Sequence, residues 1–337
     1  MHLNLEPRPD IWVGNEWGEL KEVIIGRPEQ MTYPTMIPLF KDRLNIFDEA
    51  ERSIFMDNEN KTFEQANKER YDKMCLEVEN WVKLLESRGV KVYRPRLLNE
   101  DELNYQGYLQ KGVGSIFTKD PLIVVGNLVI EGSNRVPNRR KDVFGYRHIM
   151  EERVLGSNAK WISMPTSMPD SSSKDGGKGP FLTGGDVFPL GNKNVLLGYN
   201  GVDSNLLGLK WLASILKSEG WKVHFVEYSP EVMHLDCCFS APKEGVALVC
   251  KDAFPKGLPE LIKNWDLVDV TIEEAKIDAC NGLPLGHGVY AMSTEFEHVG
   301  DKVAQKGVEI VYTDMTETNH LTGGGMRCSH GPLVREG

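Results

Sequence analysis

The chain has 337 residues, 40% of them hydrophobic and 26% charged, which is typical of a globular protein with one large domain or two ordinary ones. Its net charge of −10 argues against a nucleic-acid groove or a polybasic membrane surface, so we expect neither partner. No apolar run approaches the ~20 residues of a spanning helix, and we expect no signal peptide. Six cysteines, two of them adjacent, do not resemble a disulfide framework, which predicts a reducing, cytoplasmic location.

From the N-terminus, an apolar strand is predicted at 20–26. The next stretch, 30–62, mixes Pro, Asp, Asn and Met, and we expect it to form a lid or an extended arm. Apolar residues at spacings of three and four then predict a helix over 63–89, followed by a strand over 90–96. The same order of helix and strand recurs at 206–220 and 222–228, more weakly at 258–265 and 266–271, and at 297–307 and 309–314.

Pairs of short apolar strands around a turn form a second recurring feature. Turn pairs such as Gly126-Asn127 and Gly191-Asn192 favour hairpins. The unit of hairpin, helix and strand recurs about five times, and repeats of this kind arrange radially or stack. We therefore predict one α/β domain over 1–337, a five-bladed array around a central pocket. Hairpins are expected at 120–132, 185–199, 237–250 and 283–293.

A polar, glycine-rich loop at 171–178 lies outside this plan. It directly precedes a candidate site segment, so a mobile flap is one interpretation. A surface loop without a functional role is the more common outcome for such a stretch, and we favour it.

Three consecutive glycines precede Cys328 near the C-terminus. Glycines allow unusual backbone geometry and the close approach of a ligand, and a thiol with a nearby base can act as a nucleophile. The alternative is a glycine-rich turn with an inert buried cysteine, which is the commoner fate of a lone cysteine.

His234 and Asp236 form the second candidate pair. If they lie on a strand, both side chains point to the same side and can enter one pocket as an acid/base histidine beside a carboxylate. The alternative is a structural histidine with an aspartate cap. Asp120, before an apolar strand, and the segment 183–186, with two glycines and a carboxylate, stand where pockets form, although both also suit simple turns.

Motifs for metals and nucleotide cofactors are absent from the sequence. There is no HExxH, no paired CxxC, no GxGxxG after a strand and no GxxxxGK[ST]. We therefore expect neither a metal nor a cofactor. The GxSxG motif of many serine hydrolases is also absent.

Five segments follow one another from about residue 15 to the C-terminal region: NEWGELKEVIIGR at 15–27, KDPLIVVGN at 119–127, GGD at 184–186, MHLD at 233–236 and GGGMRC at 323–328. In this order they resemble the glycine amidinotransferases, which belong to the guanidino-group-modifying superfamily with the arginine deiminases and dimethylarginine hydrolases. The resemblance covers about residue 13 to the C-terminus.

The resemblance implies a five-bladed pseudo-symmetric α/β propeller with a central active-site pocket. It implies that Cys328 attacks the guanidinium carbon, that His234 is the general acid/base, and that Asp120 and Asp236 hold the guanidinium nitrogens. Paired, charge-assisted hydrogen bonds suit a planar cation between carboxylates. An S-amidino-cysteine intermediate would then pass to an acceptor amine or to water.

One position departs from the family pattern. An acidic residue usually precedes the Gly-Gly-Asp and contacts the guanidinium, whereas this chain has Thr183. We expect an altered substrate, with Asp186 as a carboxylate that could compensate. Asn281, in an expected loop at the edge of the site, and Arg327, beside the cysteine, complete the candidate substrate-binding residues.

The sequence therefore predicts an amidinotransferase that acts on a guanidino donor, arginine or a relative, and an amine acceptor. A hydrolase of the arginine deiminase, dihydrolase or dimethylarginine hydrolase type is the alternative on the same fold. A non-catalytic binding homologue is the third hypothesis, and the replacement of the usual acidic residue by Thr183 is its best support. The oligomeric state stays open, with a homodimer as one option.

Overall fold

The computed structural model describes residues 7–337, which form five three-stranded sheets and one two-stranded pair. In every three-stranded sheet an antiparallel pair is joined by a third, parallel strand. The predicted α/β class is confirmed. The sheets consist of β17 (His330–Glu336), β1 (Glu19–Ile25) and β2 (Lys91–Tyr93); β3 (Leu122–Val125), β4 (Leu128–Glu131) and β5 (Lys160–Ser163); β8 (Val187–Pro189), β9 (Asn194–Tyr199) and β10 (Lys222–Glu227); β11 (Phe239–Lys243), β12 (Val246–Val249) and β13 (Asp266–Asp269); and β14 (Leu283–Gly286), β15 (Val289–Ser293) and β16 (Glu309–Thr313).

The sheet with β8, β9 and β10 illustrates the repeated unit. Helix α7 (Leu206–Ser218) connects the hairpin to the parallel strand, as the periodicity predicted. The side chain of Asn205 accepts a hydrogen bond from Gly208 N at the start of the helix, and Gly220, with φ +81°, follows its end. The buried face of α7, which includes Leu209 and Leu212, packs on this sheet and on β3 and β4.

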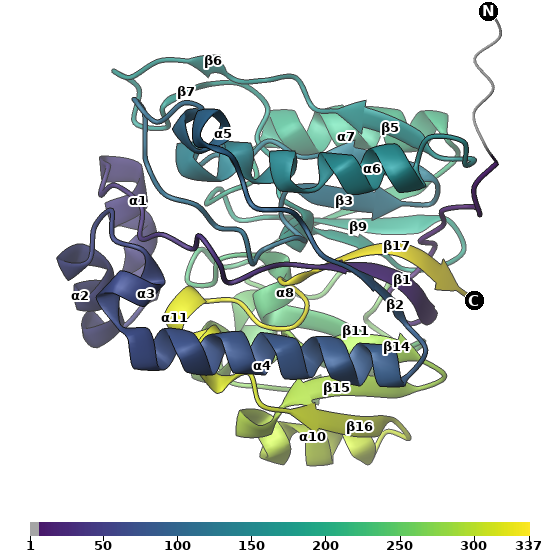
Figure 1. The fold of residues 1–337 in the computed structure, drawn as a ribbon. Helices are drawn as coiled ribbons and strands as arrows, with labels where there is room; N and C mark the ends of the chain where they lie inside the picture. The colour runs from purple at the N-terminus through teal and green to yellow at the C-terminus, as the bar shows by residue number, and fades with distance from the viewer. Residues whose placement is uncertain (1–6) are drawn as a thin grey trace, which may run out of the picture.

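One sheet joins the two ends of the chain. Strand β1 pairs with the C-terminal strand β17, with Ile25 opposite His330, and with β2 on its other side. Figure 1 shows β17 beside β1, with the long helix α4 (Lys68–Ser87) crossing nearby. This pairing carries the segment before β17, which contains Cys328, into the interior.

Residues 30–62 are a packed helical arm rather than an extended one. The arm contains α1 (Pro38–Arg43), a 3-10 turn (Leu44–Ile46) and α2 (Glu49–Asp57), which Figure 1 shows grouped beyond one end of α4. Tyr33 stacks on Phe63 with ring centroids 4.2 Å apart and meets Phe55 edge-on, so aromatic burial holds the arm in place.

Two predicted helices differ from the observed ones. The helix expected over 63–89 is broken at Asn67, whose backbone is extended and whose side chain caps α4, leaving α3 (Phe63–Ala66) as a separate turn. The segment 258–265 forms turns rather than a helix, and its eight residues are too few to stabilise a helix by themselves. The remaining elements are α5 (Glu100–Asn104), a 3-10 segment (Pro137–Gly145), α6 (Arg147–Arg153), β6 (Met168–Pro169), β7 (Gly177–Lys178), α8 (Leu235–Cys238), α9 (Ile272–Lys276), α10 (Glu297–Ala304), α11 (Thr316–Thr322) and three short 3-10 turns (Gly184–Asp186, Lys251–Ala253 and Thr294–Phe296).

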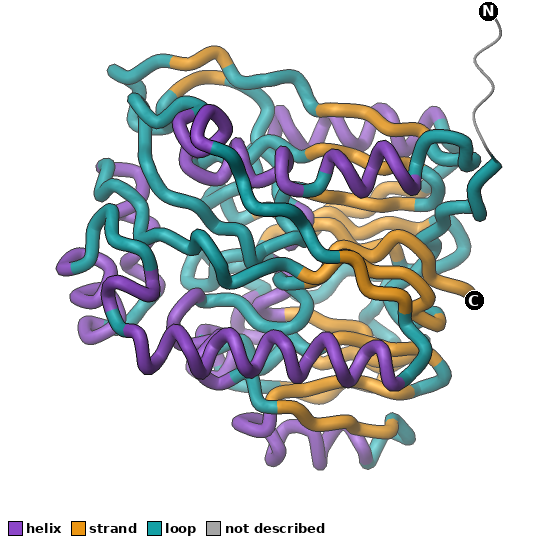
Figure 2. The backbone as a smooth tube through the Cα atoms, viewed as in Figure 1, coloured by secondary structure: helices purple, strands orange, loops and turns teal. Residues whose placement is uncertain are grey.

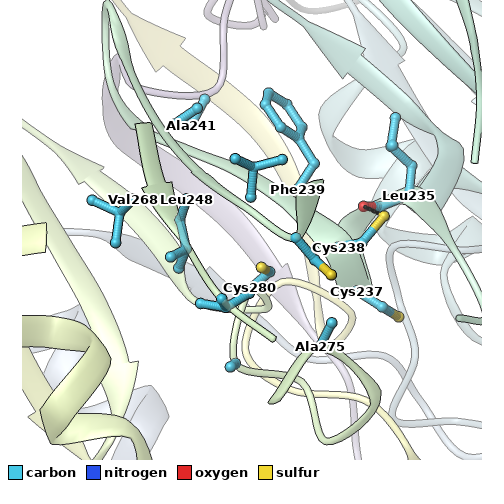
Figure 3. Close-up of a cluster of buried hydrophobic side chains, with 14 of the residues drawn as sticks. Leu235, Cys237, Cys238, Phe239, Ala241, Leu248, Val268, Ala275 and Cys280 are labelled. Atoms are coloured by element: carbon cyan, nitrogen blue, oxygen red, sulfur yellow. Dashed lines mark hydrogen bonds between the residues drawn. The ribbon is translucent and has the colours of Figure 1, made fainter. Parts of the chain in front are cut away.

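The core is divided among clusters between sheets and helices. Figure 2 shows the strands stacked toward one side of the molecule, with several helices running alongside them and short helices and loops gathered opposite. The largest cluster joins the last three sheets, and Figure 3 shows Cys238 and Cys280 within it beside Phe239 and Leu248. None of the helices described in residues 7–337 is long and apolar enough to cross a membrane.

Candidate active site

The candidate residues lie in the segments that immediately precede the first antiparallel strand of each sheet. Asp120 precedes β3, Asp186 precedes β8, Asp236 precedes β11, Asn281 precedes β14 and Cys328 precedes β17. Each segment hydrogen-bonds to the next and the last bonds to the first. The five bonds are Gly184 N to Asp120 O at 3.2 Å, Leu235 N to Asp186 Oδ1 at 3.0 Å, Asn281 Nδ2 to Asp236 O at 3.3 Å, Cys328 N to Asn281 Oδ1 at 3.0 Å and Lys119 N to Cys328 O at 3.1 Å.

The loop that carries Cys328 is fixed by Asn281. The Asn281 carboxamide accepts from Cys328 N at 3.0 Å and donates to the Cys328 sulfur, Sγ, at 3.2 Å. Gly323 leaves α11 in a left-handed conformation with φ +67°, which suits glycine. Burial raises the pKa of the Cys328 thiol well above its ordinary value, and the carboxylates of Asp236 and Asp278 add to this effect. The resting group is therefore a thiol.

His234 stands in the same pocket as Cys328, between two carboxylates. Its Nε2 lies 2.6 Å from Asp203 Oδ2, and its Nδ1 lies 3.6 Å from Asp120 Oδ1. Burial alone would lower the pKa of His234, but Asp120 and Asp203 outweigh it and raise the pKa to about 10. The ring is therefore protonated at neutral pH and can donate a proton.

Asp120 presents one oxygen to the pocket. Its Oδ2 accepts from Arg139 Nη1 at 3.3 Å, and the Arg139 guanidinium lies over the Phe117 ring. Its Oδ1 is buried and has no hydrogen-bond partner within residues 7–337. A buried carboxylate oxygen without a donor is the group that a cationic N–H ligand would satisfy.

The environment of Asp236 differs from the prediction. His234 and Asp236 do not lie on a strand, because residues Leu235–Cys238 form the helical turn α8 with His234 at its N-cap. Asp236 Oδ2 accepts from Arg327 Nη1 at 2.9 Å and lies 3.7 Å from the Cys328 sulfur. The carboxylate thus adjoins the nucleophile candidate and is already paired with an arginine.

Arg327 is a structural anchor in this arrangement. Its guanidinium is fully buried, donates to both oxygens of Glu16, and lies 3.6 Å from the centroid of the Phe188 ring. We predicted substrate contact for Arg327, but its charge is satisfied by Glu16 and Asp236, and it does not line the pocket that holds Cys328.

Asp186, Thr183 and Asn281 also lie outside the lining of that pocket. Asp186 is fully buried and accepts from Ser204 Oγ at 2.5 Å, Tyr228 OH at 2.6 Å and Leu235 N, so it is a structural carboxylate. Thr183 is buried, and its hydroxyl lacks a partner in the described part of the chain. Their predicted contacts with substrate stay predictions.

Four charged residues near the site were missed in the sequence: Arg43, Arg139, Asp203 and Asp278. Arg43 and Arg139 reach the pocket from the arm and from a 3-10 segment, and no local pattern marks them. Asp203 lies between β9 and α7 rather than before a strand, so the pattern that marked Asp120 does not apply to it. Asp278 has φ +72°, and burial raises its pKa to about 8 beside Asp236.

The outer part of the pocket is apolar. The arm and α3 contribute Met31, Pro34, Phe40, Phe47, Phe55 and Phe63 to its lining. Its charged lining residues all have ionic partners: Arg43 pairs with Asp203, Asp120 with Arg139, and His234 with Asp203. The reactive end is therefore polar and the outer wall is aromatic.

The sequence comparison identifies the family. The arginine deiminase family profile matches residues 40–254 of the chain. The chain therefore belongs to the arginine deiminase family, within the amidinotransferase-like superfamily that its motifs indicated.

Similar proteins include two kinds of amidinotransferase. The L-arginine:L-lysine amidinotransferase of Pseudomonas savastanoi pv. phaseolicola is 27% identical over 75% of this chain and 72% of its own length. The mitochondrial glycine amidinotransferase of Xenopus tropicalis is 25% identical over 96% and 82%.

Solved structures share the fold at lower identity. The inosamine-phosphate amidinotransferase StrB1 of Streptomyces griseus has a TM-score of 0.81 at 18% identity over 97% of both chains. A dimethylarginine dimethylaminohydrolase structure has a TM-score of 0.63 at 14% identity, with 93% of this chain and 100% of its own covered.

Proposed function

We propose that this protein is an amidinotransferase that moves an amidino group from a guanidino donor to an amine through Cys328. The observation that carries the proposal is the meeting, in one pocket, of Cys328, His234 and Asp120 Oδ1, which lies 3.6 Å from His234 Nδ1 and has no hydrogen-bond partner in the described residues. A nucleophile, a proton donor and a cation-binding oxygen are the groups this reaction needs. Their retention together argues against a non-catalytic binding homologue.

The proposed chemistry has two steps. The guanidinium binds against Asp120, and its positive charge favours loss of the Cys328 proton to water, which the surrounding carboxylates otherwise oppose. Asp236 does not line the pocket and is paired with Arg327, so it acts beside the sulfur rather than as the main partner of the guanidinium. The sulfur forms a bond to the guanidinium carbon, the bond from that carbon to the leaving nitrogen breaks, and His234 gives that nitrogen its proton. An acceptor amine then attacks the S-amidino-cysteine, the neutral His234 takes the proton that this amine loses, and the thiolate leaves.

We also propose that the five sheets close into a single propeller over residues 1–337, with this pocket on its axis. The cyclic set of hydrogen bonds between the five site segments and the pairing of β1 with β17 support this arrangement. The six cysteines are free thiols, which supports a cytoplasmic location. A homodimer stays a prediction.

The pocket walls favour a donor with an apolar tail. An α-amino-acid head group brings one positive and one negative charge, and the charged residues that line this pocket are already paired within the chain. The aromatic side chains of the arm instead offer apolar contact. This agrees with the altered substrate expected from Thr183, although Thr183 does not line the pocket.

Product analysis tests the proposal. The purified protein is incubated with arginine or n-butylguanidine, with and without a panel of primary amines, and the products are identified by mass spectrometry. Transfer predicts that release of ornithine or n-butylamine beyond one equivalent per enzyme requires an acceptor amine, and that the amidinated acceptor forms with it. Failure of every amine to form such a product would contradict the proposal.

Hydrolysis is the second candidate, favoured by the arginine deiminase profile that the chain matches. Water would then replace the acceptor amine. The same experiment separates the two, since a deiminase releases ammonia and a ureido product from the donor without any amine.

A further inference from the structure

We propose that Asp203 is the positioning carboxylate of His234 and that Arg43, from the arm, holds Asp203 in place. The effect of Asp203 on catalysis rests on the proposed function, but the contact between Asp203 and His234 can be tested without turnover. The Arg43–Asp203–His234 contacts link the arm, which forms the outer wall of the pocket, to the proton donor His234.

The geometry forms an unbroken chain of three side chains. Arg43 Nη1 lies 2.6 Å from Asp203 Oδ1, and Asp203 Oδ2 lies 2.6 Å from His234 Nε2. Each carboxylate oxygen therefore has its own partner, and the side chain of Asp203 is 2% exposed. Arg43 Nη2 also lies 2.7 Å from the sulfur of Met233, the residue before His234.

The loop that carries Asp203 is bonded to Thr183. Ser204, the neighbour of Asp203, accepts from Thr183 N at 3.2 Å and donates to Asp186 Oδ2. The loop after β9 is thus bonded to the segment where the family pattern has its acid. Asp203 does not replace that acid at the guanidinium, because it contacts His234 and does not line the pocket.

This pairing fixes how His234 can act. With Nε2 bonded to Asp203, Nδ1 is the ring nitrogen beside Asp120 in the pocket, and the imidazolium is the form with a proton on both nitrogens. The charged and titratable groups around the ring are Asp120, Asp186, Asp203, Arg43, Arg139 and Cys328. Burial would raise the pKa of Asp203, but Arg43 and His234 lower it to about 2, so it stays ionised.

The test measures the His234 ring directly. Protein labelled with 15N and 13C in histidine is titrated by NMR, and the His234 signals are assigned by their loss in His234→Gln. In Asp203→Asn the pKa of His234 should fall by at least one unit, and kcat, where a donor is turned over, should fall at least about tenfold. Asp203→Glu should restore part of both. A folded Asp203→Asn protein with an unchanged His234 pKa would overturn the proposal.

Two further variants separate position from charge. Asp175→Asn removes a carboxylate that pairs with Arg135 at 2.9 Å in the surface loop, and it should leave the His234 pKa and kcat unchanged. Arg43→Gln should not lower the His234 pKa, since a positive charge is removed, yet kcat should fall because Asp203 loses its anchor. Wild-type kcat in Arg43→Gln would refute the role of the arm. If no guanidino compound is turned over but the His234 pKa falls in Asp203→Asn, the proposed function fails and the pairing stands.

Discussion

The reactive end of the pocket and the arm that forms its outer wall are built in opposite ways. The reactive end takes one segment from each of the five sheets, joins those segments by hydrogen bonds from backbone and side-chain groups, and buries paired charges among them. The arm is an insertion between β1 and β2, held by aromatic packing, and Arg43 is its one charged residue that lines the pocket. We infer that the repeats position the chemistry, whereas the insertion selects what can enter.

Loss of the sulfur should give the largest effect. Cys328→Ala should abolish turnover, because no other group in the pocket can form the covalent intermediate, while the thermal midpoint stays near that of the wild type. Cys75→Ser, which changes a half-buried cysteine on α4, is the matched control and should retain activity. An active Cys328→Ala protein would refute the assignment of Cys328 as the nucleophile.

Loss of the proton donor should rank second. His234→Gln should lower kcat by roughly a hundred- to ten-thousand-fold, because protonation of the leaving nitrogen is lost. His298→Gln changes an exposed histidine paired with Glu274 on the surface and should leave kcat unchanged. Steady-state kinetics on both variants checks this, and equal losses in the two would refute the assignment.

Asp120→Asn should weaken binding and turnover less severely. A charge-assisted hydrogen bond to the guanidinium contributes roughly 1.5–3 kcal/mol, which corresponds to about a 10- to 100-fold loss in kcat/KM. The oxygen that would bind the guanidinium is Asp120 Oδ1, which has no hydrogen-bond partner in the described residues. A variant with unchanged kcat/KM for every donor would show that the guanidinium binds elsewhere.

Changes in the arm should alter selectivity and leave the chemistry intact. Phe47→Ala shortens an apolar wall residue, and we expect a roughly tenfold rise in KM for n-butylguanidine with kcat little changed. Phe225→Ala, on an exposed surface of β10, is the control. If Phe47→Ala reduced kcat as strongly as His234→Gln, the arm would contribute to the chemistry as well as to selectivity, which would contradict the roles inferred for the arm and the repeats.

Protonated His234 should also make a small, pH-dependent contribution to the stability of the fold. Its folded pKa of about 10 exceeds the ordinary 6.5, so its contribution is complete below about pH 6.5 and is lost as pH rises through about 10. The difference in thermal midpoint between wild type and His234→Gln should therefore shrink by a few degrees between pH 7 and pH 10.5. A constant difference would contradict a protonated His234 in the native state.

The sequence predicted those parts of the molecule that depend on local pattern. Pairs of short apolar runs around turn pairs indicated the hairpins, and the glycine run before Cys328 indicated its loop. Asp203 and Arg43 were not predicted, because they contact each other across 160 residues of sequence and no local spacing encodes such a contact. Arg327 was assigned to the substrate because its position beside Cys328 does not reveal that Glu16, 311 residues away, already neutralises it.

The arm was misjudged for a related reason. Its Pro, Asp and Asn residues favour irregular structure, but Tyr33, Phe55 and Phe63 meet only after folding, and their burial stabilises the short helices. The helix expected at 258–265 is absent, since its apolar spacing could not offset its short length.

Mass spectrometry of the trapped enzyme tests the central claim most directly. Wild-type protein is mixed with donor in the absence of acceptor, quenched in acid, and digested. The account predicts that the peptide containing Cys328 gains the mass of one amidino group, and that the added mass disappears when an amine is supplied before the quench. An unmodified Cys328 peptide from enzyme that turns over the same donor when an amine is present, or an adduct on another cysteine, would contradict it.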